Sequence, residues 1–246
     1  MVFWGLWFHF WLIIITLCQG MLIILVSLLD PDGRLVQRLA HWWGRILLKL
    51  AHIRLEVQGL EHLQEGQAYV FAANHRSNFD IFVLLAVLPG RFLFVAKKSL
   101  FQIPVFGWAL SRMGSIPVDR TNLKAAIKSL NQAAAIVRGG VSMMIFPEGT
   151  RGTSGELLPF KKGVFIMALK AAQPIVPVAI SGTRFIQPRK SFRVRPGPVR
   201  VVISPPINPE DYHRQEDLME AVRRAIAANY DPDFPYGPGG QNGSLG

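Results

Sequence analysis

Residues 68–80 read AYVFAANHRSNFD and join a short apolar run to a polar segment. The apolar part, residues 68–73, has the length and composition of a buried β-strand. The polar part follows at once and contains His75 and Asp80. In open α/β sheets, functional sites form just beyond the carboxyl ends of the strands. The segment therefore predicts a sheet of this class with a site around His75.

Strands and helices alternate along the rest of the chain. Short apolar runs predict further strands at residues 91–96, 115–118, 142–146, 175–180, 192–194 and 199–203. Pro177 interrupts one run, which favours an edge strand or a bulge because proline lacks the N–H of a central ladder. Helical patterns cover residues 81–88, 123–137, 162–172 and 217–230, and Gly139 follows the second as a C-cap. This order predicts an α/β domain over residues 51–230, with a mainly parallel mixed sheet flanked by helices.

Residues 1–50 carry the features of a two-helix membrane segment. No Asp, Glu, Lys or Arg occurs from residue 2 to residue 29, and this run is long enough to cross a bilayer. It is also long enough to bend back at Gln19-Gly20, so a full span and a re-entrant hairpin both remain open. A cleaved signal peptide fits less well, because the run has neither a positive start nor a small-residue cleavage site.

Basic residues follow the apolar run and set its orientation. Arg34, Arg38, Arg45 and Lys49 come after it, and no Lys or Arg precedes it. By the positive-inside rule, the rest of the chain lies on the cytoplasmic side of a membrane, which we expect to be a bacterial inner membrane. Apolar residues recur at helical spacing over 35–50, which predicts a basic amphipathic helix at the membrane surface. The alternative is a helix docked on the domain core.

The last part of the chain differs in composition from the domain. Residues 231–246 read DPDFPYGPGGQNGSLG and are rich in Pro and Gly, which predicts a disordered C-terminal tail.

The composition narrows the class of partner. The chain of 246 residues has a formal net charge of +11 at pH 7, which indicates an anionic partner such as a lipid. A nucleic acid would not account for the long uncharged run, and the sequence contains no aromatic and basic recognition motif. Cys18 is the only cysteine, which excludes disulfides and cysteine-based metal sites. The six histidines show no metal-ligand spacing.

His75 and Asp80 are candidates for acid–base chemistry. They are five positions apart, so one continuous helix would not place both on one face, whereas a turn can bring the carboxylate to the imidazole. Such a carboxylate holds the imidazole in one tautomer and stabilises its cation when it takes a proton. The alternative is structural, because Ser77 and Asp80 also form the pattern of a capping box before a helix.

Basic side chains gather at the predicted ends of other strands. Lys97 and Lys98 follow one strand, the segment GSIPVDR (114–120) contains another, and FPEGTR (146–151) follows a third. Arginine suits bidentate capture of phosphate, and lysine supplies a point charge. Because parallel strands end at the same edge of a sheet, we expect these cations beside His75.

These segments, in this order, resemble the glycerolipid acyltransferase family typified by bacterial 1-acylglycerol-3-phosphate acyltransferases. The first block of the family, Asn-His-x4-Asp, is matched by Asn74, His75 and Asp80. The second ends in Asp-Arg after a glycine and is matched at 114–120, the third is FPEGTR without change, and the fourth is a proline-containing strand matched around Pro177. The resemblance covers residues 70–182, and hydrophobic N-terminal helices also look like members of the family. Pro117 departs from the second block, where an aromatic residue is frequent, and this bears on head-group specificity.

The resemblance implies an activity and a set of site residues. Such an enzyme transfers a fatty acyl chain from acyl-CoA or acyl carrier protein to the sn-2 hydroxyl of lysophosphatidic acid, giving phosphatidic acid. His75 is then the general base and Asp80 orients it, with the acceptor's own hydroxyl as nucleophile and no metal or cofactor. Glu148 either hydrogen-bonds an acceptor hydroxyl or holds Arg151. The residues implied in substrate binding are Lys98, Arg120, Glu148, Gly149, Thr150 and Arg151.

Two other interpretations remain open on the sequence. The acceptor could be glycerol 3-phosphate, a lyso-aminolipid or another lysophospholipid. A catalytically silent lipid-binding protein would keep the basic clusters, but it would have no need of a His75–Asp80 pair.

Overall fold

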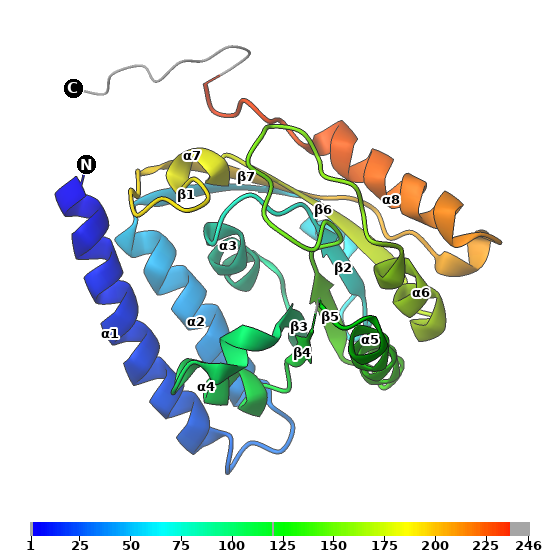
Figure 1. The fold of residues 1–246 in the computed structure, drawn as a ribbon, viewed down its shortest axis with the longest axis horizontal. Coiled ribbons are helices and arrows are strands. Elements are labelled where there is room, and N and C mark those ends of the chain that lie inside the picture. The colour runs from blue at the N-terminus through cyan, green and yellow to red at the C-terminus, as the bar shows by residue number, and fades with distance from the viewer. Residues whose placement is uncertain (1, 120, 237–246) are drawn as a thin grey trace.

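The computed structural model describes residues 2–119 and 121–236. Within them, seven strands form one sheet in the order β1-β7-β6-β2-β5-β3-β4. Neighbouring strands are parallel except β6 and β7, so the sheet is mixed and mainly parallel, as the sequence predicts. Helices cover both of its faces (Figure 1).

All strands but one lie where the apolar runs predict them, within one or two residues at each end. They are β1 (Ile53–Gln58), β2 (Val70–Ala73), β3 (Phe92–Lys97), β4 (Ile116–Val118), β5 (Ser142–Ile145), β6 (Ile175–Ser181) and β7 (Gly197–Ile203). The exception is β1, an edge strand that has no counterpart among the predicted strands. Its residues alternate between half-buried and exposed instead of forming an apolar run.

Two predictions about the sheet are wrong. Pro177 lies inside the sheet, in β6 between β7 and β2, and not at an edge. The position tolerates proline because the ladder with β7 begins one residue later, at Val178, and Pro177 contributes only its carbonyl oxygen, to Ser204 N. Residues 192–194 form no strand, and belong to a loop in which Phe192 is exposed.

Different helices cover the two faces of the sheet. On one face lie α2 (Arg34–Leu50) and α3 (Phe79–Val87), and on the other lie α5 (Leu123–Arg138), α6 (Lys162–Ala171) and α8 (Gln215–Asn229). Successive residues of β2 serve the two apolar layers in turn. Burial on both faces explains why the central strands read as continuous apolar runs. Shorter helices are α4 (Phe106–Arg112), α7 (Thr183–Ile186), η1 (Leu60–His62), η2 (Lys98–Gln102) and η3 (Pro209–Asp211).

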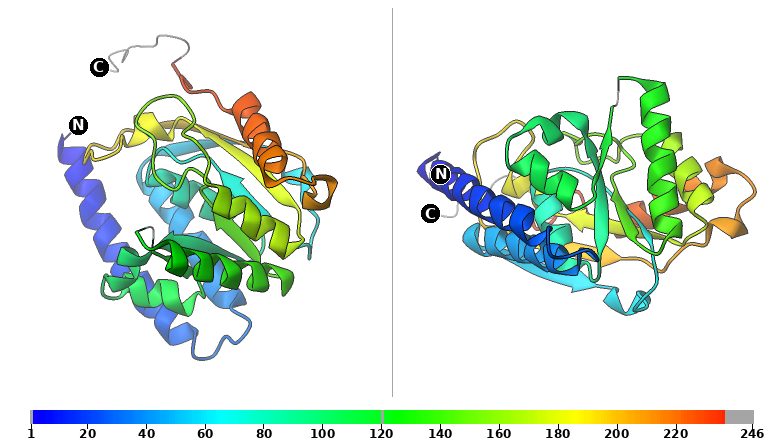
Figure 2. Two further views of the ribbon diagram at one scale, coloured as in Figure 1. Left: turned by 45° about the vertical axis from the view of Figure 1, so that its right-hand side comes forward. Right: turned by 90° about the horizontal axis from the view of Figure 1, so that it is seen from below.

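The first helix, α1 (Val2–Val26), is unbroken and lies along the domain beside α2 (Figure 2). It does not break at Gln19-Gly20, so the re-entrant bend considered there is wrong. Gln19 instead donates a hydrogen bond to the carbonyl oxygen of Leu39 in α2, and Gly20 packs against Val105. These contacts attach the middle of the helix to α2 and to the residue before α4.

The outward surface of α1 is apolar. Among the described residues, α1 is the one helix long and apolar enough to cross a membrane, with a mean hydropathy of 2.2 over Phe3–Val26. Only 11% of this window is buried inside the protein, so most of its side chains are at least partly exposed. The exposed ones include Phe3, Leu6, Phe10, Ile13, Leu17, Met21 and Leu25.

The structure shows α2 docked on the core, and its contact with a membrane stays a prediction. Val36, Ala40 and Leu47 are buried, so the helix is docked on the core. On its other side Trp42 is 63% exposed among Arg38, Arg45 and Lys49. The helix therefore presents a basic and aromatic surface next to α1.

The chain after α8 folds back onto the sheet. Asp231 N donates to Ser181 Oγ at 2.9 Å, and Phe234 is buried with the guanidinium of Arg200 over its ring. Residues 231–236 therefore differ from the predicted disordered tail, because Phe234 finds an apolar site. Residues 237–246 of that prediction lie outside the described residues, and so does Arg120.

Candidate active site

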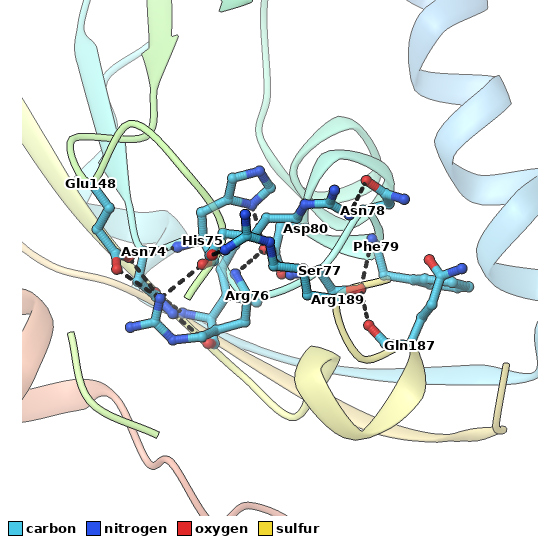
Figure 3. A network of polar contacts seen from close by, with 12 residues as sticks. Asn74, His75, Arg76, Ser77, Asn78, Phe79, Asp80, Glu148, Gln187 and Arg189 are labelled. Atoms are coloured by element: carbon cyan, nitrogen blue, oxygen red, sulfur yellow. Dashed lines mark hydrogen bonds and ion pairs between the residues drawn. The ribbon is translucent and has the colours of Figure 1, made fainter. Parts of the chain in front are cut away.

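His75 and Asp80 meet at the carboxyl end of β2. His75 Nδ1 lies 2.7 Å from Asp80 Oδ2, and the turn between β2 and α3 makes this contact possible (Figure 3). A carboxylate only accepts, so Nδ1 carries the proton and Nε2 keeps a free lone pair. The His75 side chain is 14% exposed and Asp80 is fully buried. The imidazole can therefore reach a ligand while its carboxylate partner cannot.

Asp80 also caps the turn that it belongs to. Its Oδ2 accepts hydrogen bonds from the backbone N–H groups of Arg76 at 2.7 Å and Ser77 at 2.8 Å. The contact with Ser77 N is the return bond of a capping box, and Ser77 Oγ accepts from Phe79 N at 3.2 Å. The structural and the catalytic interpretation of Asp80 therefore describe one geometry. Capping fixes the carboxylate, and the fixed carboxylate fixes the imidazole.

The ring of Phe146 stacks on one face of the imidazole of His75. The two ring centroids lie 3.8 Å apart with an interplanar angle of 13°, which is a stacked arrangement. Phe146 directly follows β5, which pairs with β2, so neighbouring strand ends place the two rings together. Stacking restricts the plane of the imidazole, and the hydrogen bond to Asp80 restricts its rotation within that plane.

The next residue of the same loop, Arg76, forms a buried ion pair with Glu148. Arg76 Nη1 donates to Glu148 Oε2 at 2.7 Å and to Oε1 at 3.0 Å, and Arg76 is only 1% exposed. Burial alone lowers the pKa of Arg76, but the hydrogen bonds and charge of Glu148, with those of Tyr230, raise that pKa overall. Figure 3 shows the His75 ring and the Arg76 guanidinium pointing in different directions.

Every acceptor position of Glu148 is used inside the protein. Its Oε1 also accepts from His75 N at 2.9 Å, and its Oε2 from Leu158 N at 2.8 Å. Glu148 does not contact Arg151, so the expectation that it holds Arg151 is wrong. It ties the FPEGTR segment to the backbone of His75, and being 1% exposed it has no open side for an acceptor hydroxyl.

A cavity of about 380 Å³ opens beside His75. Apolar side chains from α1, α2, α3, β3 and α4 form most of its wall, among them Ile23, Trp43, Leu85, Phe94, Ala109 and Met113. Cationic and polar groups meet His75 at the other part of the wall, from Lys97, Asn78, Thr150, Arg151 and Arg189. The cavity wall thus combines many apolar side chains with a few cationic ones, and His75 lies among them.

Comparison with known proteins assigns a family to this arrangement. The model of the acyltransferase family matches residues 54–181. A 1-acyl-sn-glycerol-3-phosphate acyltransferase of Limnanthes alba is 36% identical over 227 residues, which cover 89% of this chain and 79% of that protein. The chain belongs to the acyltransferase family.

Other acyltransferases show the same likeness. A human 1-acyl-sn-glycerol-3-phosphate acyltransferase alpha is 34% identical over 191 residues, which cover 76% of this chain and 68% of that protein. The crystal structure of the 1-acyl-sn-glycerophosphate (LPA) acyltransferase PlsC of Thermotoga maritima superposes with a TM-score of 0.83 at 26% identity. The match covers 92% of this chain and 93% of that one.

The predicted binding residues of this acyltransferase fall into three groups. Thr150 and Arg151 line the cavity with His75, and Arg151 Nη1 donates to Asn78 Oδ1 at 2.8 Å. Lys98 stands apart from the cavity wall, with its Nζ 3.5 Å from Asp119 Oδ2. Hydrogen bonds from Thr121, together with Lys98, lower the pKa of Asp119. Gly149 lies in the turn after β5 with a φ of 71°, a conformation that favours glycine.

Sequence reasoning missed Arg189, and it left Lys97 and Asn74 out of the implied binding residues. Arg189 lines the cavity and donates to Arg151 O at 2.8 Å, although the two are 38 residues apart. Lys97, one residue before the predicted Lys98, is the lysine that faces the cavity. Asn74 is fully buried and exchanges two hydrogen bonds with the backbone of Ile180, which locks the end of β2 to β6. A cation count of the loop 187–196 would have been the one available signal for Arg189.

Proposed function

We propose that this acyltransferase moves a fatty acyl chain from a thioester donor to the sn-2 hydroxyl of lysophosphatidic acid, giving phosphatidic acid. The observation that carries the proposal is that His75 lines one cavity together with many apolar side chains and the cations Lys97, Arg151 and Arg189. An acyl chain suits the apolar part, and a phosphate suits the cations. The names of the relatives from Limnanthes alba and Homo sapiens support the same acceptor.

His75 acts as general base. Its Nε2 takes the proton of the acceptor hydroxyl as that oxygen bonds to the thioester carbonyl carbon, and the carbonyl oxygen becomes an oxyanion. The carbon–sulfur bond then breaks, and the leaving thiolate takes the proton back from His75. Asp80 stabilises the imidazolium between the two steps, through the 2.7 Å contact to Nδ1. The acceptor is itself the nucleophile, so no acyl-enzyme forms and neither a metal nor a cofactor takes part.

The phosphate of the acceptor binds the cations of the cavity wall. Arg151 and Arg189 supply guanidinium groups and Lys97 a point charge, with Thr150 beside them. Lys98, Gly149 and Arg120 remain predicted binding residues on the resemblance alone. Glu148 acts indirectly, because it holds the backbone of His75.

The surfaces of the N-terminal helices support a position of the site at a membrane. α1 presents an apolar outward surface, and α2 adds Trp42 with three basic residues. Since α1 is docked along the domain through Phe8, Thr16 and Gln19, we propose that it lies in the lipid surface with the domain attached. The basic residues after α1 favour the cytoplasmic face, and we propose a bacterial inner membrane.

A purified enzyme assay tests the proposed function. Protein in detergent is offered lysophosphatidic acid with acyl-CoA or with acyl carrier protein, and the products are identified by mass. We expect phosphatidic acid with at least one donor, and we expect the His75→Ala variant to form none above background. Competition among lysophosphatidic acid, glycerol 3-phosphate and other lysophospholipids distinguishes the alternative acceptors. Binding of lysolipid without any acyl product would favour the lipid-binding alternative.

A further inference from the structure

The loop 188–193 presents an aromatic side chain to solvent among cations. It follows α7 and has the sequence PRKSFR. Phe192 is 76% exposed, and Arg189, Lys190 and Arg193 are exposed around it. A large apolar side chain that remains in water forgoes a substantial part of its transfer free energy, so its exposure indicates a partner.

Hydrogen bonds hold this loop in shape. Ser191 N donates to Pro188 O at 3.0 Å, and Arg193 N donates to Ser191 Oγ at 3.1 Å. Gln187 Nε2 donates to Ser191 O at 3.1 Å and so joins the loop to α7. The backbone on both sides of Phe192 is thus fixed, and the ring is held outward.

The loop lies against the N-terminal part of α1. The rings of His9 and Phe192 lie 5.5 Å apart in an edge-on contact, and Gln187 Nε2 donates to His9 Nε2 at 3.2 Å. A Cβ atom at Gly5 would clash with the carbonyl oxygen of Phe192, so this close approach depends on glycine. Figures 1 and 2 show the yellow loop beside the end of α1 that carries the N-terminus. Phe192 therefore extends the exposed apolar surface of α1 onto the catalytic domain.

The same loop reaches the active-site cavity. Arg189 lines that cavity and donates to Arg151 O at 2.8 Å. One short segment thus connects the apolar surface of α1 to the cationic part of the cavity wall. Whatever binds Phe192 from outside is placed next to the site where the acceptor phosphate binds.

We propose that the loop 188–193 is a membrane contact of the catalytic domain itself, with an anionic bilayer as its partner. Phe192 enters the lipid beside α1, and Lys190 and Arg193 bind lipid phosphate groups at the surface. Continuity with α1 and the complementary charge favour lipid over a protein partner. This inference rests on the proposed membrane association, and it adds that α1 and α2 are not sufficient for binding in the productive orientation.

A fluorescence measurement tests the position of Phe192 directly. Cys18 is the only cysteine, so a Cys18→Ser background accepts a single label through Phe192→Cys or, as control, Ala228→Cys. Ala228 is exposed on α8, which lies across the molecule from α1 (Figure 1). On addition of vesicles of phosphatidylglycerol and phosphatidylcholine, we expect a blue shift and quenching by brominated lipid at position 192 and not at 228. A label at 192 that stays in water while the protein is bound would overturn the proposal, and so would a shift caused by acyl carrier protein instead of vesicles.

A binding comparison separates this inference from the proposed function. Phe192→Ala should weaken vesicle binding by about tenfold, the scale of losing one inserted aromatic side chain. Leu60→Ala, which removes a partly exposed apolar side chain in η1, should leave binding unchanged. Turnover of a dispersed short-chain lysophosphatidic acid should be unchanged in both variants, because neither residue belongs to the catalytic site. Loss of that turnover in Phe192→Ala alone would overturn the membrane role, whereas its absence in the wild-type protein would contradict only the proposed function.

Discussion

Two side-chain pairs that start from one loop share the same short contact but differ in their surroundings. His75 and Asp80 lie 2.7 Å apart, and so do Arg76 and Glu148, although His75 and Arg76 are neighbours in sequence. Among the described residues, the His75 ring has one hydrogen-bond partner, and it opens onto a cavity. Arg76 is 1% exposed and donates to Glu148, His75 O, Glu156 O and the Tyr230 hydroxyl.

The difference shows that neighbouring residues of one short loop have separate roles, one in proton exchange and one in holding the backbone. A group that exchanges protons needs a free position that faces the substrate, and His75 Nε2 has one. A group that holds a loop needs every position filled, because an unpaired buried charge is strongly destabilising. Glu148 connects the two pairs, since its Oε1 accepts from both Arg76 and His75 N. The saturated pair is therefore expected to hold the backbone of the reactive one.

The largest effect is expected at the reactive pair. His75→Ala removes the base and should lower turnover by roughly 100-fold or more. The unfolding free energy should change little, because Asp80 keeps the N–H groups of Arg76 and Ser77 as donors. His213→Ala removes an exposed imidazole and serves as the control. Turnover of His75→Ala within a few-fold of wild type would end the proposed mechanism.

Asp80→Asn sharpens the comparison within the reactive pair. Asn can still accept from the two backbone N–H groups, so the turn should fold. Its amide cannot stabilise an imidazolium, so turnover should fall by at least about 100-fold. The measurement is turnover alongside thermal unfolding, with Asp211→Asn in η3 as a matched surface change. Normal turnover would mean that Asp80 only caps α3.

Glu148→Gln should act mainly on stability, by lowering the free energy of unfolding. Leaving the buried guanidinium of Arg76 without its counter-charge is expected to cost about 3–5 kcal/mol of unfolding free energy. The matched control is Glu56→Gln, because Glu56 Oε2 lies 3.0 Å from Arg200 Nε with both side chains partly exposed. That pair should be worth no more than about 1 kcal/mol. A Glu148→Gln protein as stable as wild type but unable to bind acceptor would show that Glu148 contacts the substrate after all.

A smaller effect is expected at Arg151, a cation that lines the cavity. Arg151→Ala removes one charge-assisted contact to phosphate, worth about 1.5–3 kcal/mol. The Michaelis constant for the acceptor should therefore rise more than that for the donor. Arg138→Ala, at the exposed end of α5, should change neither constant. If only the Michaelis constant for the donor rose, the cationic part of the cavity would bind the donor and not the acceptor.

The sequence predicted the central sheet well because its strands are buried on both faces. β2, β3, β5 and β6 read as apolar runs with little ambiguity. The edge strand β1 was not predicted, because its alternation of half-buried and exposed residues is also found in loops and turns. The edge position predicted from Pro177 was wrong for a related reason. A proline fits inside this sheet because the ladder with β7 begins one residue later, and the local sequence does not determine where a ladder begins.

The site was predictable where its partners are close in the chain. His75 and Asp80 are joined by one turn, so their spacing permits the contact that the structure shows. The partner of Glu148 was not predictable, because Arg76 and Arg151 are both candidates and only the pairing of β2 with β5 decides between them. Arg189 enters the cavity through the loop after α7, and no local pattern announces that.

The most direct test of the account asks whether the acceptor hydroxyl attacks the thioester itself. The protein is mixed with an isotopically labelled acyl donor and no acceptor, and the intact protein mass is measured before and after lysophosphatidic acid is added. Direct transfer with His75 as base predicts unmodified protein at every time and labelled phosphatidic acid only after the acceptor arrives, with the His75→Ala variant inactive throughout. A protein that gains the mass of one acyl chain in the absence of acceptor, and loses it when lysophosphatidic acid is added, would contradict the mechanism.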